Sequence, residues 1–256
     1  MVSAFITSGS DEDSEGEQPL HSEHGFALLA CGLSPSAMQQ ILGWIERLGP
    51  HRKRHFAGSH MKFIPTMDAT ISLPNVFLLA FNAGDAAAEK EARGYWARAK
   101  HDVPRAGFAV ALGKAGLDAV EPFQPELPVI KMSETVPSKQ ARQLAMAFMG
   151  FAGQGLIGID ASDWLAQFGN AKAISAIEWS GERDQSPAAA AEMARATLTS
   201  VIPRGIAVVA RSSAYWHLAD AAELLICNGG IFSCLIDDSE DFAPGVLVFY
   251  RENDVC

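Results

Sequence analysis

Two aspartates, Asp160 and Asp163, lie three residues apart in a segment that separates two patterns typical of helices. Carboxylates in such a connecting segment can orient and polarise a water molecule for attack on a phosphate. The same short acceptors can instead cap the helix expected to begin near Trp164, because they bind the free N–H groups of its first turn. The residue types leave both roles open, and each aspartate can have a different one. Trp164 itself is expected to be a packing residue.

Other candidate groups give weaker indications. His217 beside Tyr215 and Trp216 is interpreted as a packing cluster at a corner between a strand and a helix. Ser36 and Ser186 have no GxSxG motif around them, and the chain contains no HExxH or P-loop pattern. The sequence therefore gives no basis for ordinary hydrolase or metal chemistry, and no metal or cofactor is expected.

Composition and charge exclude several classes of protein. The chain has 256 residues, of which 48% are hydrophobic, which is ample for a packed core. Its net charge of −10 disfavours nucleic-acid and anionic-membrane binding, and the basic cluster at residues 51–55 is interpreted as a solvated loop. No apolar run approaches the roughly 18 residues of a membrane span, and the N-terminus does not resemble a signal peptide. We therefore expect a cytoplasmic protein without membrane insertion.

Residues 1–24 include a run of acidic residues among Ser and Gly, so this segment is expected to be a disordered leader. The four cysteines, which lack CxxC spacing, are expected to be buried or incidental thiols rather than a zinc site or disulfide framework: Cys31, Cys227, Cys234 and Cys256.

Apolar runs of strand length alternate with helical patterns over the rest of the chain, which is typical of an α/β layer architecture. Ser34 and Ser186, each followed by a proline, are expected to cap helices. Strands are expected near residues 26–31, 62–65, 75–80, 108–112, 128–131, 173–178, 206–210, 231–236 and 246–250, and helices near residues 34–49, 86–100, 137–152, 164–169, 186–198 and 218–227.

Several segments resemble one family in order and spacing. Residues 155–164 are similar to the FtsZ segment written GLINVDFADV, residues 181–183 to its GEDRA-like turn, and residues 204–208 to its ARGVLV strand. Residues 60–69 resemble FIAVNTDAQ, and residues 75–88 occupy the place of the MVFVTAGMGGGTGTGAA signature. The chain thus resembles the tubulin/FtsZ superfamily over nearly its whole folded part.

This resemblance implies an α/β fold of two lobes joined by a central helix. Residues 25–136 would form a nucleotide-binding-like lobe with a parallel sheet, and residues 137–153 the central helix. Residues 154–256 would form the α+β lobe that follows it in FtsZ.

The chain departs from the family at the positions that hold nucleotide. The GGGTGTG loop is replaced by residues 82–88, which keep only Gly84 and add the carboxylate of Asp85. The first glycine-rich turn is reduced to Gly32 followed by Pro35, which lacks a backbone N–H, and the base-recognising position falls near Ser138. Phosphate loops need successive N–H groups and room for the backbone. We therefore expect a degenerate pocket, with remnant loops at Gly32, Gly84 and Asp85 and no bound nucleotide.

Asp160 and Asp163 align with the two FtsZ aspartates that complete the GTP site of a neighbouring subunit. The resemblance therefore implies a role for both in trans. The expected function is that of a non-GTPase partner or regulator of a bacterial cell-division polymer, in contact with FtsZ-type subunits. Two alternatives remain: a self-assembling structural protein independent of nucleotide, and a divergent GTPase in which Asp85 helps to bind a metal ion.

Overall fold

The structure is a computed structural model. It describes residues 3–7, 26–48, 61–64, 76–102, 106–114, 120–123, 127–151, 161–171, 173–183, 185–214, 217–225 and 230–255. Within these residues one ten-stranded sheet has the strand order β3-β1-β2-β4-β5-β6-β7-β10-β8-β9.

The first half of the sheet is built on four parallel strands. They are β2 (Phe26–Cys31), β4 (Val76–Asn82), β5 (Ala106–Leu112) and β6 (Val129–Met132). Their continuous apolar runs suit strands that are buried on both faces. The four strands predicted from these runs are confirmed, with ends shifted by a few residues at most.

An antiparallel extension precedes these strands in the sheet. β1 (Ser3–Thr7) pairs with β2 and with β3 (Met61–Ile64). The prediction of a disordered leader is therefore wrong for Ser3–Thr7, because its apolar residues extend the sheet beside β2. Residues 8–25, which contain the acidic run, lie outside the described residues.

The second half of the sheet is mainly antiparallel. β10 (Gly245–Val255) lies between β7 (Ala173–Ser180) and β8 (Val201–Ala210), and β8 pairs in parallel with β9 (Ile231–Ile236). β7 also pairs in parallel with β6, from Val129 opposite Ala173 to Met132 opposite Ala176. This short seam makes the two halves one continuous sheet.

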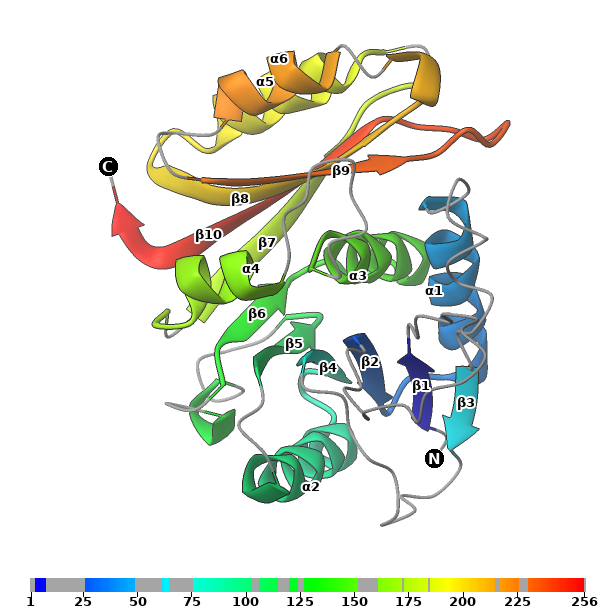
Figure 1. Ribbon diagram of the computed structural model, residues 1–256, viewed down its shortest axis with the longest axis vertical. Helices are drawn as coiled ribbons and strands as arrows, with labels where there is room; N and C mark the ends of the chain where they lie inside the picture. The colour runs from blue at the N-terminus through cyan, green and yellow to red at the C-terminus, as the bar shows by residue number, and fades with distance from the viewer. Residues whose placement is uncertain are drawn as a thin grey trace, which may run out of the picture.

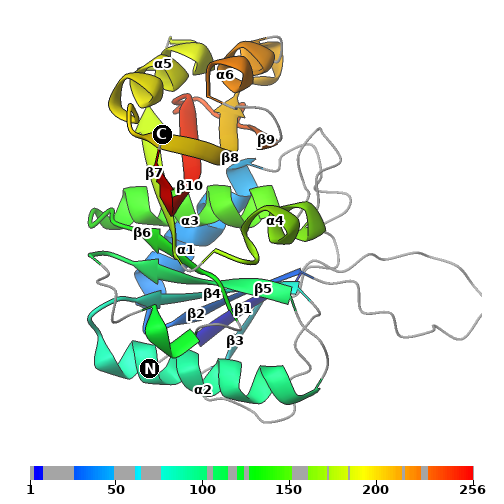
Figure 2. The same cartoon turned by 90° about the vertical axis from the view of Figure 1, so that its left-hand side faces the viewer.

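The helices form layers on the two halves (Figure 1). α2 (Ala86–Asp102) covers one face of the first half, and α1 (Pro35–Leu48) and α3 (Pro137–Phe151) lie on its other face. The remaining helices are α4 (Ala161–Phe168), α5 (Pro187–Thr197) and α6 (His217–Leu225), with short 3-10 turns η3 (Glu121–Phe123) and η4 (Ser212–Ala214). Figure 2 shows α5 and α6 outside the second half, at the opposite end of the molecule from α2.

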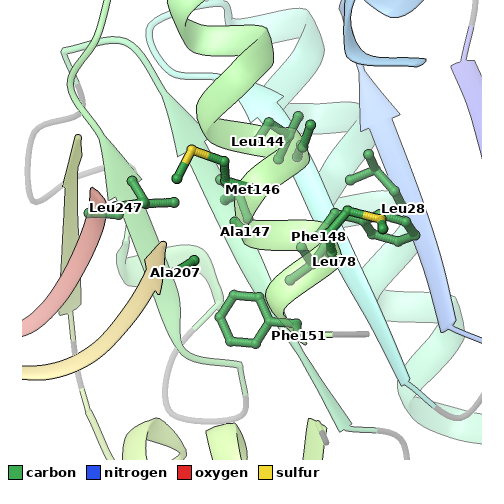
Figure 3. Close-up of a cluster of buried hydrophobic side chains, with 14 of the residues drawn as sticks. Leu28, Leu78, Leu144, Met146, Ala147, Phe148, Phe151, Ala207 and Leu247 are labelled. Atoms are coloured by element: carbon green, nitrogen blue, oxygen red, sulfur yellow. The ribbon is translucent and has the colours of Figure 1, made fainter. Parts of the chain in front are cut away.

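α3 is the centre of this arrangement. Every residue from 141 to 151 is buried, including Arg142 and Gln143. Figure 3 shows that its side chains pack against both halves of the sheet, with Leu28 and Leu78 on one side and Ala207 and Leu247 on the other. Two separate apolar clusters lie under α2 and under α5 and α6. The mixed α/β class predicted from the sequence is confirmed.

Two local expectations need correction. Ser186 occupies the N-cap position of α5 with the usual extended backbone, but its side chain makes no capping hydrogen bond, and its backbone carbonyl accepts from Ala189 N at 3.1 Å. α4 begins at Ala161, three residues before Trp164, because the apolar pattern marks the buried face of a helix and not its first residue. A search of the described residues for a helix long and apolar enough to span a membrane finds none.

Candidate functional site

Three loops follow the parallel strands at the carboxyl edge of the first half-sheet, where open α/β sheets bind their ligands. β2, β4 and β5 are each followed by a glycine with positive φ: Gly32 at 68°, Gly84 at 86° and Gly113 at 91°. Within the described part of the chain these are all the residues with positive φ. The backbone therefore turns sharply at the same edge after three neighbouring strands.

Hydrogen bonds tie these loops together. Asn82 Nδ2 donates to the carbonyl of Gly32 at 3.2 Å, and Ala83 N donates to Leu112 O at 2.9 Å. Gly113 N donates to Met132 O at 2.8 Å. Loop and strand groups at this edge thus bind one another.

The first loop touches the start of α2. A Cβ placed on Gly32 would lie 2.4 Å from Ala88 Cβ and 3.6 Å from Asp85 Oδ2. Real Cβ atoms do not approach so closely, so only glycine fits here. The turn after β2 therefore packs directly on the first turn of α2, which leaves no gap at that contact.

The N-terminus of α2 is occupied by carboxylates of its own chain. Asp85 Oδ1 accepts from Ala87 N at 2.9 Å and from Ala88 N at 3.2 Å. Glu89 Oε1 accepts from Gly84 N at 2.9 Å. A helix N-terminus attracts anions through its free N–H groups and its dipole. Here Asp85 already binds two N–H groups of the first turn, and Glu89 binds the N–H of Gly84 just before the helix.

The same arrangement recurs before α3. Glu134 Oε1 accepts from Thr135 N and from Val136 N, each at 2.8 Å, and Gln140 Nε2 donates to Glu134 O. At the start of α1, Ser34 Oγ accepts from Ala37 N at 3.1 Å, as the sequence predicted. The acceptors Glu89 and Glu134 were missed by sequence reasoning. An acidic residue near each predicted helix start was the available signal.

Cations also occur at this edge. Lys114 follows Gly113, and Lys139 lies in the first turn of α3, next to the exposed Ser138. Arg93 pairs with Glu89 at 3.3 Å on the exposed side of α2. The edge is therefore of mixed charge, with acidic groups on the helix N-termini.

The second candidate region lies at the other end of α3. Asp163 is exposed in the first turn of α4, and Asp160 lies outside the described residues. The next residue, Trp164, is fully buried and donates from Nε1 to Gly150 O at 3.2 Å. Its ring contacts Phe151 and Phe249, with centroid separations of 4.3 and 5.0 Å. The packing role predicted for Trp164 is thus confirmed, and it fixes Asp163 beside the C-terminus of α3.

The structure does not bring the two regions together within one molecule. α3 follows β6 at the carboxyl edge and has 15 residues, so at 1.5 Å per residue its ends are about 22 Å apart. Gly32, Gly84 and Asp85 lie near its start, and Asp163 lies near its end. Any joint action of the two regions requires two molecules.

Two further groups are placed by the structure. His217 begins α6, while Tyr215, Trp216 and the basic cluster at 51–55 lie outside the described residues. Cys31 and Cys234 are buried free thiols, and burial raises the pKa of both, that of Cys234 to about 12. Both are therefore unreactive protonated groups at neutral pH. No three metal-binding side chains cluster anywhere in the part of the chain that the structure describes.

Comparison with known proteins gives a fold assignment. No family model matches the chain, and no curated protein matches it. Among solved structures, the chain is similar to an empty FtsZ dimer of M. jannaschii at 15% identity and a TM-score of 0.54, over 69% of this chain and 63% of that one. A W319Y mutant of M. jannaschii FtsZ gives 15% identity and a TM-score of 0.53, over 70% and 65%. A GTPγS-form TubZ protofilament of Bacillus thuringiensis gives 10% identity and a TM-score of only 0.40.

These similarities show that the chain has the FtsZ/tubulin fold. It spans less than two thirds of the M. jannaschii chains that it matches. The fold expected from the resemblance of residues 155–164 and their neighbours is confirmed. The sequence identities are too low to transfer an activity.

Proposed function

We propose that this protein is an FtsZ-like subunit without GTPase activity that acts as a partner or regulator of an FtsZ-type cytoskeletal polymer in the bacterial cytoplasm. The observation that carries the proposal is that Asp85 accepts from two N–H groups in the first turn of α2, while Glu89 and Glu134 accept from loop N–H groups just before α2 and α3. A triphosphate at this edge would have to displace three carboxylates and would be repelled by them.

The proposal includes an asymmetry between the two ends of α3. The end with Asp163 presents an exposed carboxylate next to a rigidly packed tryptophan. In our proposal this end docks on the nucleotide face of a genuine FtsZ-type subunit, where Asp160 and Asp163 orient the attacking water in trans. The carboxyl edge cannot accept the next subunit through a nucleotide, so the protein caps or modulates the polymer.

The first experiment is equilibrium binding of a fluorescent GTP analogue, with and without magnesium and with GDP as competitor. We expect no binding up to millimolar nucleotide. Micromolar competitive binding would overturn the proposal and support a divergent GTPase.

The second experiment adds the protein to an FtsZ-type GTPase and measures polymer sedimentation and GTP turnover. We expect substoichiometric amounts to change both quantities, and Asp163→Ala to weaken the effect while the fold is kept. Unchanged sedimentation and turnover would contradict the proposal.

One specific observation favours the alternative of nucleotide-independent self-assembly. A structural neighbour with a TM-score above 0.5 is an FtsZ dimer described as empty. Sedimentation velocity over a concentration series separates the alternatives, since a monomer at all concentrations excludes self-assembly. Assemblies that grow with protein concentration in the absence of nucleotide would favour self-assembly over the proposal that the protein caps an FtsZ-type polymer.

A further inference from the structure

The connection between β9 and β10, residues 237–244 and here called the strap, is held by side chains from three other parts of the chain. Arg47 comes from α1, Arg142 from α3, and Arg211 and Ser212 from the segment after β8. These groups are distant in sequence, so the strap is a point where α1, α3 and the second half of the sheet meet.

Arg47 makes the most extensive contact. Its Nη2 donates to Asp237 Oδ2 at 2.8 Å and to Asp241 O at 3.2 Å. Its guanidinium lies 4.1 Å from the centroid of the Trp44 ring, which adds a cation–π contact. The Asp237 side chain is only 1% exposed, whereas that of Arg47 is 28% exposed. The pair is therefore accessible to water from the Arg47 side.

Arg142 binds the C-terminal end of the strap. Its Nη2 donates to Ala243 O at 2.8 Å, and its Nε lies 2.9 Å from Glu178 Oε1 as an ion pair without hydrogen-bond geometry. Burial raises the pKa of Glu178, while Arg142 opposes this change. The Arg142 guanidinium lies 5.2 Å from the Trp44 ring, so Trp44 contacts both arginines.

The rest of the strap has few apolar contacts. Phe242, at 4% exposure, is its large buried side chain, and Arg211 lies 5.0 Å from the Phe242 ring. Asp238 Oδ1 accepts from Ser212 N at 2.8 Å and from Ser212 Oγ at 2.9 Å. Asp238, Glu240 and Asp241 are exposed. Pro244 is also buried, and its carbonyl accepts from Gly181 N at 3.0 Å. One aromatic side chain, this proline and a set of polar contacts therefore hold an acidic segment.

These contacts make the strap easier to open than the sheet that it joins. Ordering its backbone costs conformational entropy, which the small net contribution of each neutral hydrogen bond offsets only in part. Segments with few buried apolar contacts open locally at a lower free energy than the core. The charged contact of Arg47 with Asp237 is thus the deciding one, because Arg47 bonds the strap at two separate residues.

We propose that the strap is a conformational latch. In the closed state it bonds to Arg47 and to Arg142 of the Arg142–Glu178 pair, and it opens as a unit when the contact of Arg47 with Asp237 is broken. The open state releases these two guanidinium groups, which both lie against the Trp44 ring on α1. This device is independent of the function proposed above, since it uses none of the residues at the carboxyl edge or in α4.

Amide hydrogen exchange on the full chain tests the latch, with Arg47→Ala as the main variant. We expect exchange in residues 238–243 to become at least about tenfold faster, while β4 and β5 keep wild-type protection. Arg93→Ala is the matched control, because Arg93 also pairs with a carboxylate on a helix but lies far from the strap. It is expected to leave the strap unchanged.

Two outcomes would overturn the proposal. Unchanged strap protection in Arg47→Ala would mean that Phe242 and the contacts of Arg142 and Ser212 hold the segment without Arg47. A uniform increase of exchange over β4, β5 and the strap would mean that Arg47 supports global stability.

Asp237→Asn gives an independent check, since it removes the charge with little change in shape and is expected to accelerate exchange of the same residues. If it accelerates none of them, the pairing of Arg47 with Asp237 is not the latch.

Discussion

Carboxylates lie near both ends of α3, but their hydrogen bonding and exposure differ between the two ends. At the start of the helix, Asp85 and Glu134 point back onto N–H groups of their own chain. At its end, Asp163 is exposed on α4 beside the buried Trp164. The same type of side chain thus binds backbone N–H groups near one end of α3 and is exposed near the other. The difference comes from which backbone groups lie within reach.

The largest expected effect on stability is at Trp164, which packs beside the C-terminal end of α3. Trp164→Ala should lower the free energy of unfolding by about 3–5 kcal/mol, because it leaves a cavity among Phe151, Phe168 and Phe249 and orphans Gly150 O. Urea unfolding followed by circular dichroism measures the loss. Trp164→Phe, which keeps most of the volume, should lose clearly less. Equal losses for the two variants would show that volume does not decide the effect.

The N-terminal part of α3 contains one member of a buried ion pair, Arg142, whose partner is Glu178. Arg142→Ala should cost about 3 kcal/mol, since it leaves Glu178 buried without its cation. A double variant, Arg142→Met with Glu178→Leu, should recover most of the loss because no uncompensated charge remains. Chemical denaturation of the three proteins tests this, and a double variant weaker than the single one would contradict it.

Alanine substitutions at two glycines of the carboxyl edge test how tightly the loops pack there. Gly32→Ala should lower the free energy of unfolding by about 1–3 kcal/mol from strain at positive φ, and by more if Ala88 cannot move. Gly84→Ala has the same kind of strain but open space around its Cβ, so it should cost less. Thermal melts of both variants check the order, and the reverse order would mean that the contact of Gly32 with Ala88 is not tight.

Removing a carboxylate tests whether the edge is closed by the chain itself. Asp85→Ala should lower the free energy of unfolding by about 1 kcal/mol through loss of the cap on α2. It should also free two N–H groups, so that inorganic phosphate at millimolar concentration stabilises the variant and not the wild-type protein. Melting temperatures with and without phosphate measure this. Equal response of both proteins would show that Asp85 does not block an anion.

The smallest effect on stability is expected at Asp163. Asp163→Ala should change the free energy of unfolding by only about 0.5 kcal/mol, through its position in the first turn of α4. Chemical denaturation measures it. A loss above about 2 kcal/mol would assign Asp163 a structural role, which is the capping alternative left open by the sequence.

Much of the fold was predictable because its signals are local. The apolar run of β2 and the serine–proline start of α1 predict these elements nearly to the residue. The periodicity of α3 likewise predicts a buried central helix. β1 was not predicted, since five residues of moderate apolar character become a strand only through pairing with β2. Ser186 shows the reverse case, where a correct cap signal is not used by the side chain.

The sequence by itself determined the alternation of strands and helices, the glycines that allow the turns after the strands, and the position of Asp85 just before α2. These features depend on residue type and on spacing along the chain. Only the tertiary structure decided that Asp85 binds Ala87 N, that Arg142 meets Glu178, and that Arg47 reaches Asp237 across 190 positions. The physical reason is that hydrogen bonds and ion pairs act over a few ångströms, and chain folding alone sets which distant groups come within that range.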